Sequence, residues 1–171
     1  MDIGRTILSN AHPKLRLDAG TWGTMGVSFG FAIAAQALHP NKKVVMVLGD
    51  SAFGFSAMEI ETATRYKMPL KVIIINNNGI TGGDEEIDPT GNPIVIPATH
   101  LTPYAKYEKI AEVFGGKGAN VRDPKALAAI LPEMLKDDNF WILNVFISPT
   151  AGRKPQEFSW LTRKENDKAK L

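Results

Sequence analysis

The stretches KVVMVLGDS, residues 43–51, and LKVIIINNNG, residues 70–79, decide the fold of this chain. Each is a short apolar run with β-branched residues that ends in polar and glycine residues, a pattern typical of a buried strand. Residues 58–66 between them favour a helix, which Pro69 ends because the residue before a proline avoids the helical region. The sequence therefore predicts a β-α-β unit with strands at 43–48 and 70–75.

Polar residues stand at the carboxyl end of both predicted strands. Asp50 follows the first strand, and Asn77 and Gly79 follow the second. A right-handed crossover brings these strand ends together, at the edge of a parallel sheet where ligands bind. Carboxylate, amide and carbonyl oxygens suit Mg²⁺ or Ca²⁺, and free N–H groups at a helix start suit a diphosphate. The alternative is an ordinary β-α-β unit, since Asp, Asn and Gly are common turn residues.

Several segments resemble one enzyme family. Gly49-Asp50-Ser51 followed by Asn76-Asn77 resembles the thiamine-diphosphate motif. More narrowly, GDSAFGFS at 49–56 resembles the branch of 2-hydroxyacyl-CoA lyases and oxalyl-CoA decarboxylases. Three further segments support this branch, and the last is closer to the lyase: LDAGTWGTMGV at 17–27, FGGKG at 114–118 and RKPQEFSWLTR at 153–163.

The resemblance implies roles for the residues at the two strand ends. Asp50, Asn77 and the carbonyl of Gly79 would hold Mg²⁺. The backbone N–H groups of Ser51 and Ala52 would contact the diphosphate of the cofactor.

The resemblance also gives roles to the glycine-rich loop before residue 27. The Gly23 carbonyl would accept a hydrogen bond from the amino group of the cofactor, and Met25 would be an apolar wedge beneath it. A core position at a helix entry is the alternative for Met25. The full set of implied cofactor-binding residues is Gly23, Met25, Gly49, Asp50, Ser51, Ala52, Asn77 and Gly79.

The implied fold is the thiamine-diphosphate-binding fold, a three-layer α/β/α arrangement with a mainly parallel sheet. Residues 1–150 would form this domain, and residues 151–171 a tail that folds over the substrate as a lid. The start, MDIGR at 1–5, resembles an internal family segment that a strand precedes. We therefore expect an N-terminally truncated domain without its first strand, and favour a fragment over one half of a split enzyme.

The implied activity is that of a thiamine-diphosphate- and Mg²⁺-dependent carbon–carbon lyase of fatty acid α-oxidation. It would cleave 2-hydroxyacyl-CoA to formyl-CoA and an aldehyde one carbon shorter. In the family, the activating Glu comes from a separate N-terminal pyrimidine-binding domain, in the same longer chain or in another subunit. We therefore expect no catalytic residue here, an inactive chain alone, and a homo-oligomer when complete. The alternatives are oxalyl-CoA decarboxylase and, in another class, a non-catalytic cofactor-binding subunit.

Basic residues and the C-terminus suggest a substrate and a location. By resemblance, Arg5, Arg153 and Lys154 are candidates for the phosphates of CoA, with a solvated surface charge as the alternative for each. The terminal Ala169-Lys170-Leu171 is a near variant of the Ser-Lys-Leu peroxisomal signal. The expected location is the peroxisome, and otherwise the cytoplasm.

The composition narrows the classes of protein to which the chain could belong. The chain has 171 residues, a net charge of +2 and no cysteine, so nucleic-acid binding, disulfides and zinc–thiolate sites are not indicated. Its apolar runs are too short for a membrane span. His12, His39 and His100 have no metal-ligand spacing and are interpreted as surface or turn residues. The acidic residues 84–86 lie in a long loop at 81–103, where a solvated loop is favoured over a second metal site.

The remaining pattern alternates helix and strand. Asp123 is the expected N-cap of a helix that begins with Pro124. The other predicted elements are helices from about residue 6, at 27–38, at 104–114 and at 124–136, and strands at 117–121 and 140–147.

Overall fold

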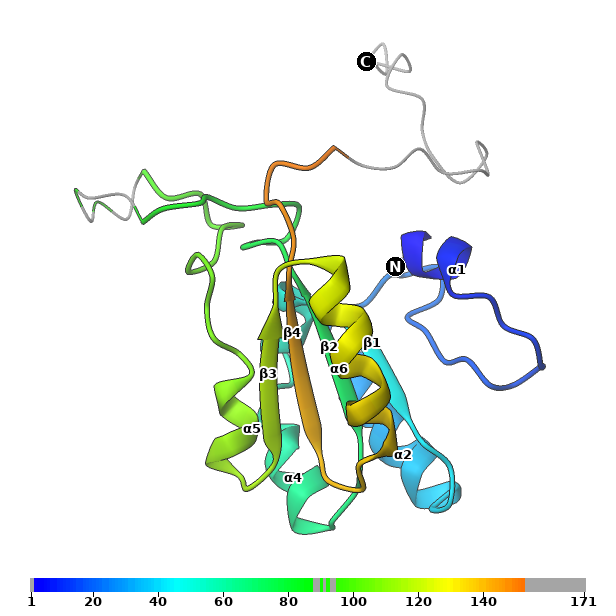
Figure 1. Ribbon diagram of the computed structural model, residues 1–171. Coiled ribbons are helices and arrows are strands. Elements are labelled where there is room, and N and C mark those ends of the chain that lie inside the picture. Colours follow the sequence, from blue (N-terminus) through cyan, green and yellow to red (C-terminus); the bar gives the residue numbers. More distant parts are fainter. Residues whose placement is uncertain (1, 88–89, 91, 93–94, 153–171) are drawn as a thin grey trace. The chain divides into compact units, whose positions relative to one another are not determined.

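A computed structural model describes residues 2–87, 90, 92 and 95–152 (Figure 1). The chain divides into two compact units, one of which is Ala19–Ala151. The other contains the described N-terminal residues, in which helix α1 spans Asp2–Ile7. The unit Ala19–Ala151 holds the sheet, the core and the strand ends discussed above.

Four strands form one parallel sheet in the order β1-β2-β4-β3 (Figure 1). Strands β1, β2 and β4 consist largely of apolar residues, and all six residues of β4 are buried, whereas the edge strand β3 contains Lys117 and Asn120 and buries only Val121. Near-continuous apolar strands are typical of parallel sheets, because helices cover their faces. The strands are β1 Val45–Gly49, β2 Lys71–Asn76, β3 Lys117–Val121 and β4 Trp141–Phe146.

Helices pack on both faces of the sheet, so the fold has three layers. On one face, Phe29, Ile60 and Ala111 pack with strand residues such as Ile142. On the other face, helix α6 contributes Met134 to a second core with Leu143 and its neighbours. The predicted α/β/α arrangement with a parallel sheet is therefore confirmed. Helices α2 Val27–Leu38, α3 Asp50–Gly54, α4 Glu59–Arg65 and α5 Lys109–Val113 contribute to the first face, and α6 Pro124–Lys136 to the second.

Several elements match their predicted bounds closely. Helices α2 and α6 and strand β3 span the predicted residues. Asp123 is the N-cap of α6, since its Oδ1 accepts hydrogen bonds from the N–H groups of Lys125 (3.0 Å) and Ala126 (2.9 Å). These elements were predictable because their signals are local: a capping side chain, a proline at the first turn, and apolar periodicity.

Three elements differ from the prediction. Helix α1 ends at Ile7, whereas a helix was expected to begin near there. The turn expected after Asp50 is the short helix α3. Helix α5 begins only at Lys109, and Tyr104 lies outside it with a left-handed backbone (φ 52°) and an N–H that donates to the side chain of Asn78. A left-handed residue does not continue a right-handed helix.

No helix in the described ranges is long and apolar enough to cross a membrane.

Candidate functional site

The carboxyl ends of β1 and β2 lie side by side. The two strands pair in parallel, with Gly49 opposite Ile75. Asp50 begins α3 directly after β1, and the segment from Asn77 to Gly79 follows β2. The topology thus brings the residues of the predicted metal site to one edge of the sheet, where open α/β sheets bind ligands.

Asp50 is buried at this edge of the sheet, with 1% of its surface exposed. Its Oδ1 accepts the N–H of Ser51 at 2.8 Å, and its Oδ2 accepts the N–H of Gly79 at 3.0 Å. Burial raises the pKa of the Asp50 carboxyl above its ordinary value, and the backbone hydrogen bonds oppose that rise. A buried carboxylate is costly without a compensating positive charge, so this position suits a cation.

A left-handed residue shapes the turn after β2. Asn78 has φ 62°, a conformation that Asn tolerates better than most residues. Its N–H donates to Oδ1 of Asn76 (3.1 Å), and its Nδ2 donates to the carbonyl oxygen of Asp84 (2.8 Å). Its Oδ1 accepts the N–H of Tyr104 (2.9 Å). Asn78 therefore fixes the backbone of the turn and ties it to two later segments.

Three oxygen-bearing groups converge here: the Asp50 carboxylate, the Asn77 amide and the Gly79 carbonyl. One end of the Asn77 amide lies 2.7 Å from the Gly79 oxygen and 3.2 Å from Asp50 Oδ1, and the other lies 3.2 Å from the nitrogen of Gly82. Without a metal, hydrogen bonding places the amide nitrogen at the first end and the oxygen toward Gly82. The reverse orientation gathers three oxygens, an arrangement that needs a cation among them.

Gly23 and Met25 lie in the glycine-rich loop before α2. Gly23 is exposed and left-handed (φ 62°), and Met25 is half-buried. The loop contacts the turn after α3, because Ser56 Oγ donates to the Gly26 carbonyl at 2.7 Å. A Cβ at Gly26 would lie 2.7 Å from the Cβ of Phe55, so only glycine allows this approach. The cofactor roles of Gly23 and Met25 stay predictions.

Ser51 and Ala52, the predicted diphosphate contacts, lie in the first turn of α3. The N–H of Ser51 is directed at the Asp50 carboxylate rather than at open space. The Ser51 hydroxyl is buried and has no hydrogen-bond partner among the described residues. This hydroxyl, which sequence reasoning did not single out, is therefore a polar group that a ligand could satisfy.

Tyr107 also lies near Asp50. The sequence analysis did not predict that this residue belongs to the site. Its ring packs on that of Phe53, with 5.4 Å between the ring centroids. Burial raises the pKa of the Tyr107 hydroxyl, and the Asp50 carboxylate raises it further. No sequence signal marks this neighbour, because only the packing of the segment before α5 brings it here.

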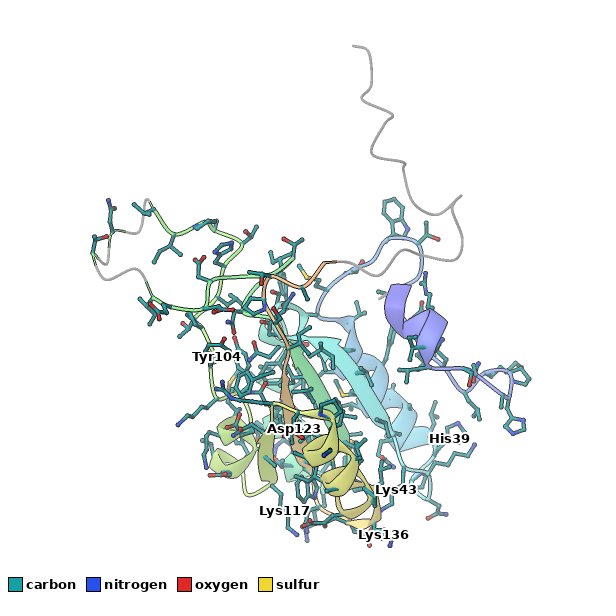
Figure 2. The ribbon with its side chains drawn as sticks, turned by 45° about the horizontal axis from the view of Figure 1, so that its top comes forward. His39, Lys43, Tyr104, Lys117, Asp123 and Lys136 are labelled. Atoms are coloured by element: carbon teal, nitrogen blue, oxygen red, sulfur yellow. The ribbon has the colours of Figure 1, made fainter. Side chains whose placement is uncertain are left out.

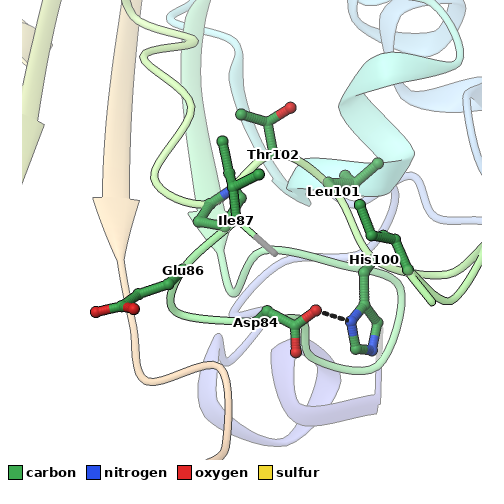
Figure 3. Close-up of a pocket in the computed structure, with 8 residues that line it drawn as sticks. Asp84, Glu86, Ile87, His100, Leu101 and Thr102 are labelled. Atoms are coloured by element: carbon green, nitrogen blue, oxygen red, sulfur yellow. Dashed lines mark hydrogen bonds and ion pairs between the residues drawn. The ribbon is translucent and has the colours of Figure 1, made fainter. Parts of the chain in front are cut away.

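Two described residues of the long loop after β2, Asp84 and His100, contact each other (Figure 3). His100 Nδ1 lies 2.7 Å from Asp84 Oδ2, and the His100 side chain is only 23% exposed. His100, which was interpreted as a surface or turn residue, is partly buried, whereas Asp84, Glu85 and Glu86 are exposed, as predicted for a solvated loop. Within the described residues, no group of three or more His, Cys, Asp or Glu side chains could hold a metal.

The predicted CoA contacts lie mostly outside the described residues. Arg5 is described, and two of its guanidinium nitrogens pair with the carboxylate of Asp18 at 2.9 Å. Arg153 and Lys154 are not among the described residues, and neither is the C-terminal tripeptide. These roles stay predictions.

Comparison with known proteins identifies the family of this chain. Residues 2–145 match the family described as thiamine pyrophosphate enzyme, C-terminal TPP binding domain. A solved structure, the thiamine diphosphate-dependent 4-hydroxybenzoylformate decarboxylase of Rhodococcus jostii RHA1, is similar with a TM-score of 0.57. That likeness covers 74% of this chain and 23% of that protein at 22% identity, and supports the fold alone.

Curated relatives are more similar in sequence. The 2-hydroxyacyl-CoA lyase of Oryza sativa subsp. japonica is 50% identical over 157 residues, 89% of this chain and 27% of that protein. The human 2-hydroxyacyl-CoA lyase 1 is 45% identical, over 95% of this chain and 30% of its own length. The oxalyl-CoA decarboxylase of Escherichia coli K12 is 40% identical, over 96% of this chain and 29% of its own length. The chain thus spans less than a third of these relatives, and it belongs to the family of C-terminal thiamine pyrophosphate-binding domains of thiamine pyrophosphate enzymes.

Proposed function

We propose that this chain is the cofactor-binding part of a 2-hydroxyacyl-CoA lyase, which cleaves 2-hydroxyacyl-CoA to formyl-CoA and an aldehyde one carbon shorter. The observation that carries the proposal is the convergence of the Asp50 carboxylate, the Asn77 amide and the Gly79 carbonyl at the edge of the sheet. The substrate class rests on relatives of 45–50% identity that bear the lyase name.

Mg²⁺ fits the oxygen groups at this edge. In our proposal, the Asn77 amide presents its oxygen to the metal beside Asp50 and Gly79. The set then offers a carboxylate, an amide oxygen and a backbone carbonyl, the hard ligands that Mg²⁺ prefers. The cost of burying Asp50 is offset by the charge of the ion.

Thiamine diphosphate fits the surroundings of this metal site. We assign its diphosphate to the N–H of Ala52 and to Ser51, whose hydroxyl is buried without a partner among the described residues. Gly23 and Met25 would contact its ring portion. The cofactor, when bound, supplies an electron sink for carbon–carbon bond cleavage. The residues of this chain bind and orient it.

The proposed enzyme needs a second domain. Activation of the cofactor requires a carboxylate beside its pyrimidine ring, which we assign to an N-terminal pyrimidine-binding domain in the same longer polypeptide or in another subunit. The chain alone is then inactive, and the complete enzyme is a homo-oligomer. Relatives more than three times the length of this chain leave room for such a domain.

Substrate contacts and location are part of the same proposal. Arg5, Arg153 and Lys154 would meet the phosphates of CoA, and the tail after residue 150 would fold over the thioester. The C-terminal Ala169-Lys170-Leu171 supports a peroxisomal enzyme of fatty acid α-oxidation.

Oxalyl-CoA decarboxylase is the second candidate, favoured by the relative of that name at 40% identity. The complete enzyme, assayed with a long-chain 2-hydroxyacyl-CoA and with oxalyl-CoA, separates the two functions. The proposal predicts formyl-CoA and aldehyde from the first substrate, and preferential turnover of oxalyl-CoA would overturn it. Turnover of neither substrate would favour a non-catalytic cofactor-binding subunit.

A thermal-shift measurement tests the cofactor site separately. Mg²⁺ with thiamine diphosphate is expected to raise the Tm of the wild type, because ligands that bind only the folded state stabilise it. Asp50→Ala should abolish the rise. An equal rise in Tm in both proteins would show that Asp50 does not bind the metal or the cofactor.

A further inference from the structure

Three polar side chains are fully buried in the core between β2, β4 and the start of α5. Asn76 is the last residue of β2, and Glu108 directly precedes α5; each is 1% exposed. Asn144 stands in the middle of β4, among apolar residues, with no exposed surface. Buried polar groups are costly unless they are hydrogen-bonded, so their partners decide what they do.

Hydrogen bonds join these side chains into one polar row. Nδ2 of Asn76 donates to Oδ1 of Asn144 (3.2 Å), and Nδ2 of Asn144 donates to Oε2 of Glu108 (2.8 Å). On β3, Nδ2 of Asn120 donates to Oε1 of Glu108 (2.8 Å). The carbonyl oxygen of Ala105 also accepts from Asn76 (3.3 Å) and from Asn144 (2.9 Å). The polar row therefore crosses three neighbouring strands and includes the segment before α5.

One end of the polar row reaches the turn after β2. Oδ1 of Asn76 accepts the N–H of Asn78 at 3.1 Å. Asn77 and Gly79, which flank Asn78, are residues that we assign to the metal. Because the Asn76 side chain is held from Asn144 on one side and holds the turn on the other, its orientation links the polar row to the metal site.

Filling the core does not require a polar row at this place. Phe140 and Ile142, which alternate with Asn144 along the same face of β4, pack in the apolar core. Replacing both partners of a buried hydrogen bond by apolar groups of similar shape is often nearly neutral for stability. A satisfied buried network, in contrast, fixes side-chain orientations, since hydrogen bonds are strong where water is excluded. The polar row is therefore suited to orienting the turn.

We propose that Glu108 and Asn144 are positioning residues for the metal site, which act through the side chain of Asn76 on the turn that carries Asn77 and Gly79. The inference rests on the proposed function and adds to it two residues remote from the ligand set in sequence. The polar row holds the turn in its metal-binding form before the ion arrives, which lowers the cost of binding.

The Kd of Mg²⁺ tests this role without turnover. Calorimetry gives its value for the complete enzyme with saturating thiamine diphosphate. Glu108→Met keeps the length of the side chain and removes both acceptors, so we expect the Kd to rise about fivefold, the value of one net hydrogen bond. Glu108→Gln is the rescue variant. Its oxygen accepts from Asn144, and its nitrogen donates to Asn120, whose amide is free to turn over on the exposed part of β3, so the Kd should stay within about twofold.

Two further variants separate position from stability. Glu108→Met with Asn144→Leu removes a donor together with its acceptor, so the Tm of the ligand-free protein should fall less than in Glu108→Met alone. The Kd of Mg²⁺ should nevertheless stay raised about fivefold or more. Ile142→Val is the matched control on β4: it lowers the Tm by removing a buried methyl group, and it should leave the Kd within about twofold of the wild type.

The outcomes separate the polar row from the proposed function. A Kd that follows the Tm in every variant, Ile142→Val included, overturns the positioning role. So does an unchanged Kd in Glu108→Met and in the double variant. Failure of Glu108→Gln to restore the Kd would assign the effect to the charge of Glu108 and overturn the role of its hydrogen bonds. A wild type that binds no Mg²⁺ with thiamine diphosphate would instead overturn the proposed metal site itself.

Discussion

The N–H of Gly79 donates to Oδ2 of Asp50 across 3.0 Å, although the two residues lie 29 positions apart in the chain. The bond joins the ends of β1 and β2, and the carbonyl oxygen of Gly79 lies 2.7 Å from the Asn77 amide. It holds two of the proposed metal ligands in a fixed relation before any ligand binds, and such preorganisation lowers the cost of binding.

Gly79→Ala tests how closely this site depends on backbone packing. A Cβ at Gly79 would lie 2.5 Å from the Gly82 oxygen and 2.8 Å from the Thr99 oxygen, so the backbone must shift. We expect a loss of stability on the order of 1–3 kcal/mol and loss of the Tm rise with Mg²⁺ and thiamine diphosphate. Urea unfolding and thermal shift measure the two effects.

Gly30→Ala is the matched control. Gly30 lies within α2, and a Cβ there meets nothing within 4 Å. Alanine favours the helix over glycine by up to about 1 kcal/mol, so this variant should be slightly more stable and keep the ligand-induced rise. If the two alanine variants behaved alike, close packing at Gly79 would not be what the site requires.

Asp123→Ala tests an element that the sequence predicted in full. Oδ1 of Asp123 accepts two N–H groups of the first turn of α6. Its removal should cost about 1 kcal/mol in the free energy of unfolding, as is typical for an N-cap. Asp123→Asn keeps the acceptor oxygen and should cost only part of this. A full-sized loss in the Asn variant would point to the charge of Asp123 rather than to its hydrogen bonds.

The candidate site was only partly predictable from the sequence. Asp50, Asn77 and Gly79 could be placed together because a β-α-β crossover and the ends of two apolar strands determine their positions. The pairing of His100 with Asp84 and the contact of Tyr104 with Asn78 could not. Both depend on the path of a long loop without periodicity, and Tyr104 takes a left-handed backbone that no propensity favours for an aromatic residue.

Lys71 is the first residue of β2 and lies at the other end of this strand from the candidate site. It makes the stability of the protein depend on pH. Its side chain is fully buried, and its Nζ donates to the carbonyl oxygen of Asn139. Burial, and next the nearby charge of Lys43, lower the pKa of Lys71 to about 8 from its ordinary 10.5. Lys43 and Lys117, which also repels it, lie at the same end of the molecule (Figure 2).

The sign follows from proton binding. Between about pH 8 and pH 10.5, unfolded Lys71 holds a proton that folded Lys71 has lost, so its contribution to the free energy of unfolding rises with pH. Comparing urea unfolding of the wild type and Lys71→Met across this window isolates the group. Across this window, the difference between the free energies of unfolding of the two proteins should change by on the order of 1–3 kcal/mol. Lys109→Met is the control, at a surface lysine whose pKa Glu112 raises. Its free energy of unfolding should still rise with pH as in the wild type. Loss of this rise in the control would contradict the assignment to Lys71.

Asn78 allows backbone strain and side-chain hydrogen bonds to be separated. Its left-handed backbone (φ 62°) suits glycine, so Asn78→Gly should keep the turn and lose the bonds to Asp84 and Tyr104. Asn78→Ala loses the same bonds, and alanine, unlike glycine, has a Cβ that is unfavourable in a left-handed backbone. The Ala variant should therefore be about 1 kcal/mol less stable than the Gly variant. Urea unfolding should therefore rank the wild type above the Gly variant and the Gly variant above Ala. If glycine matched the wild type, the two side-chain bonds of Asn78 would contribute nothing to the stability of the protein.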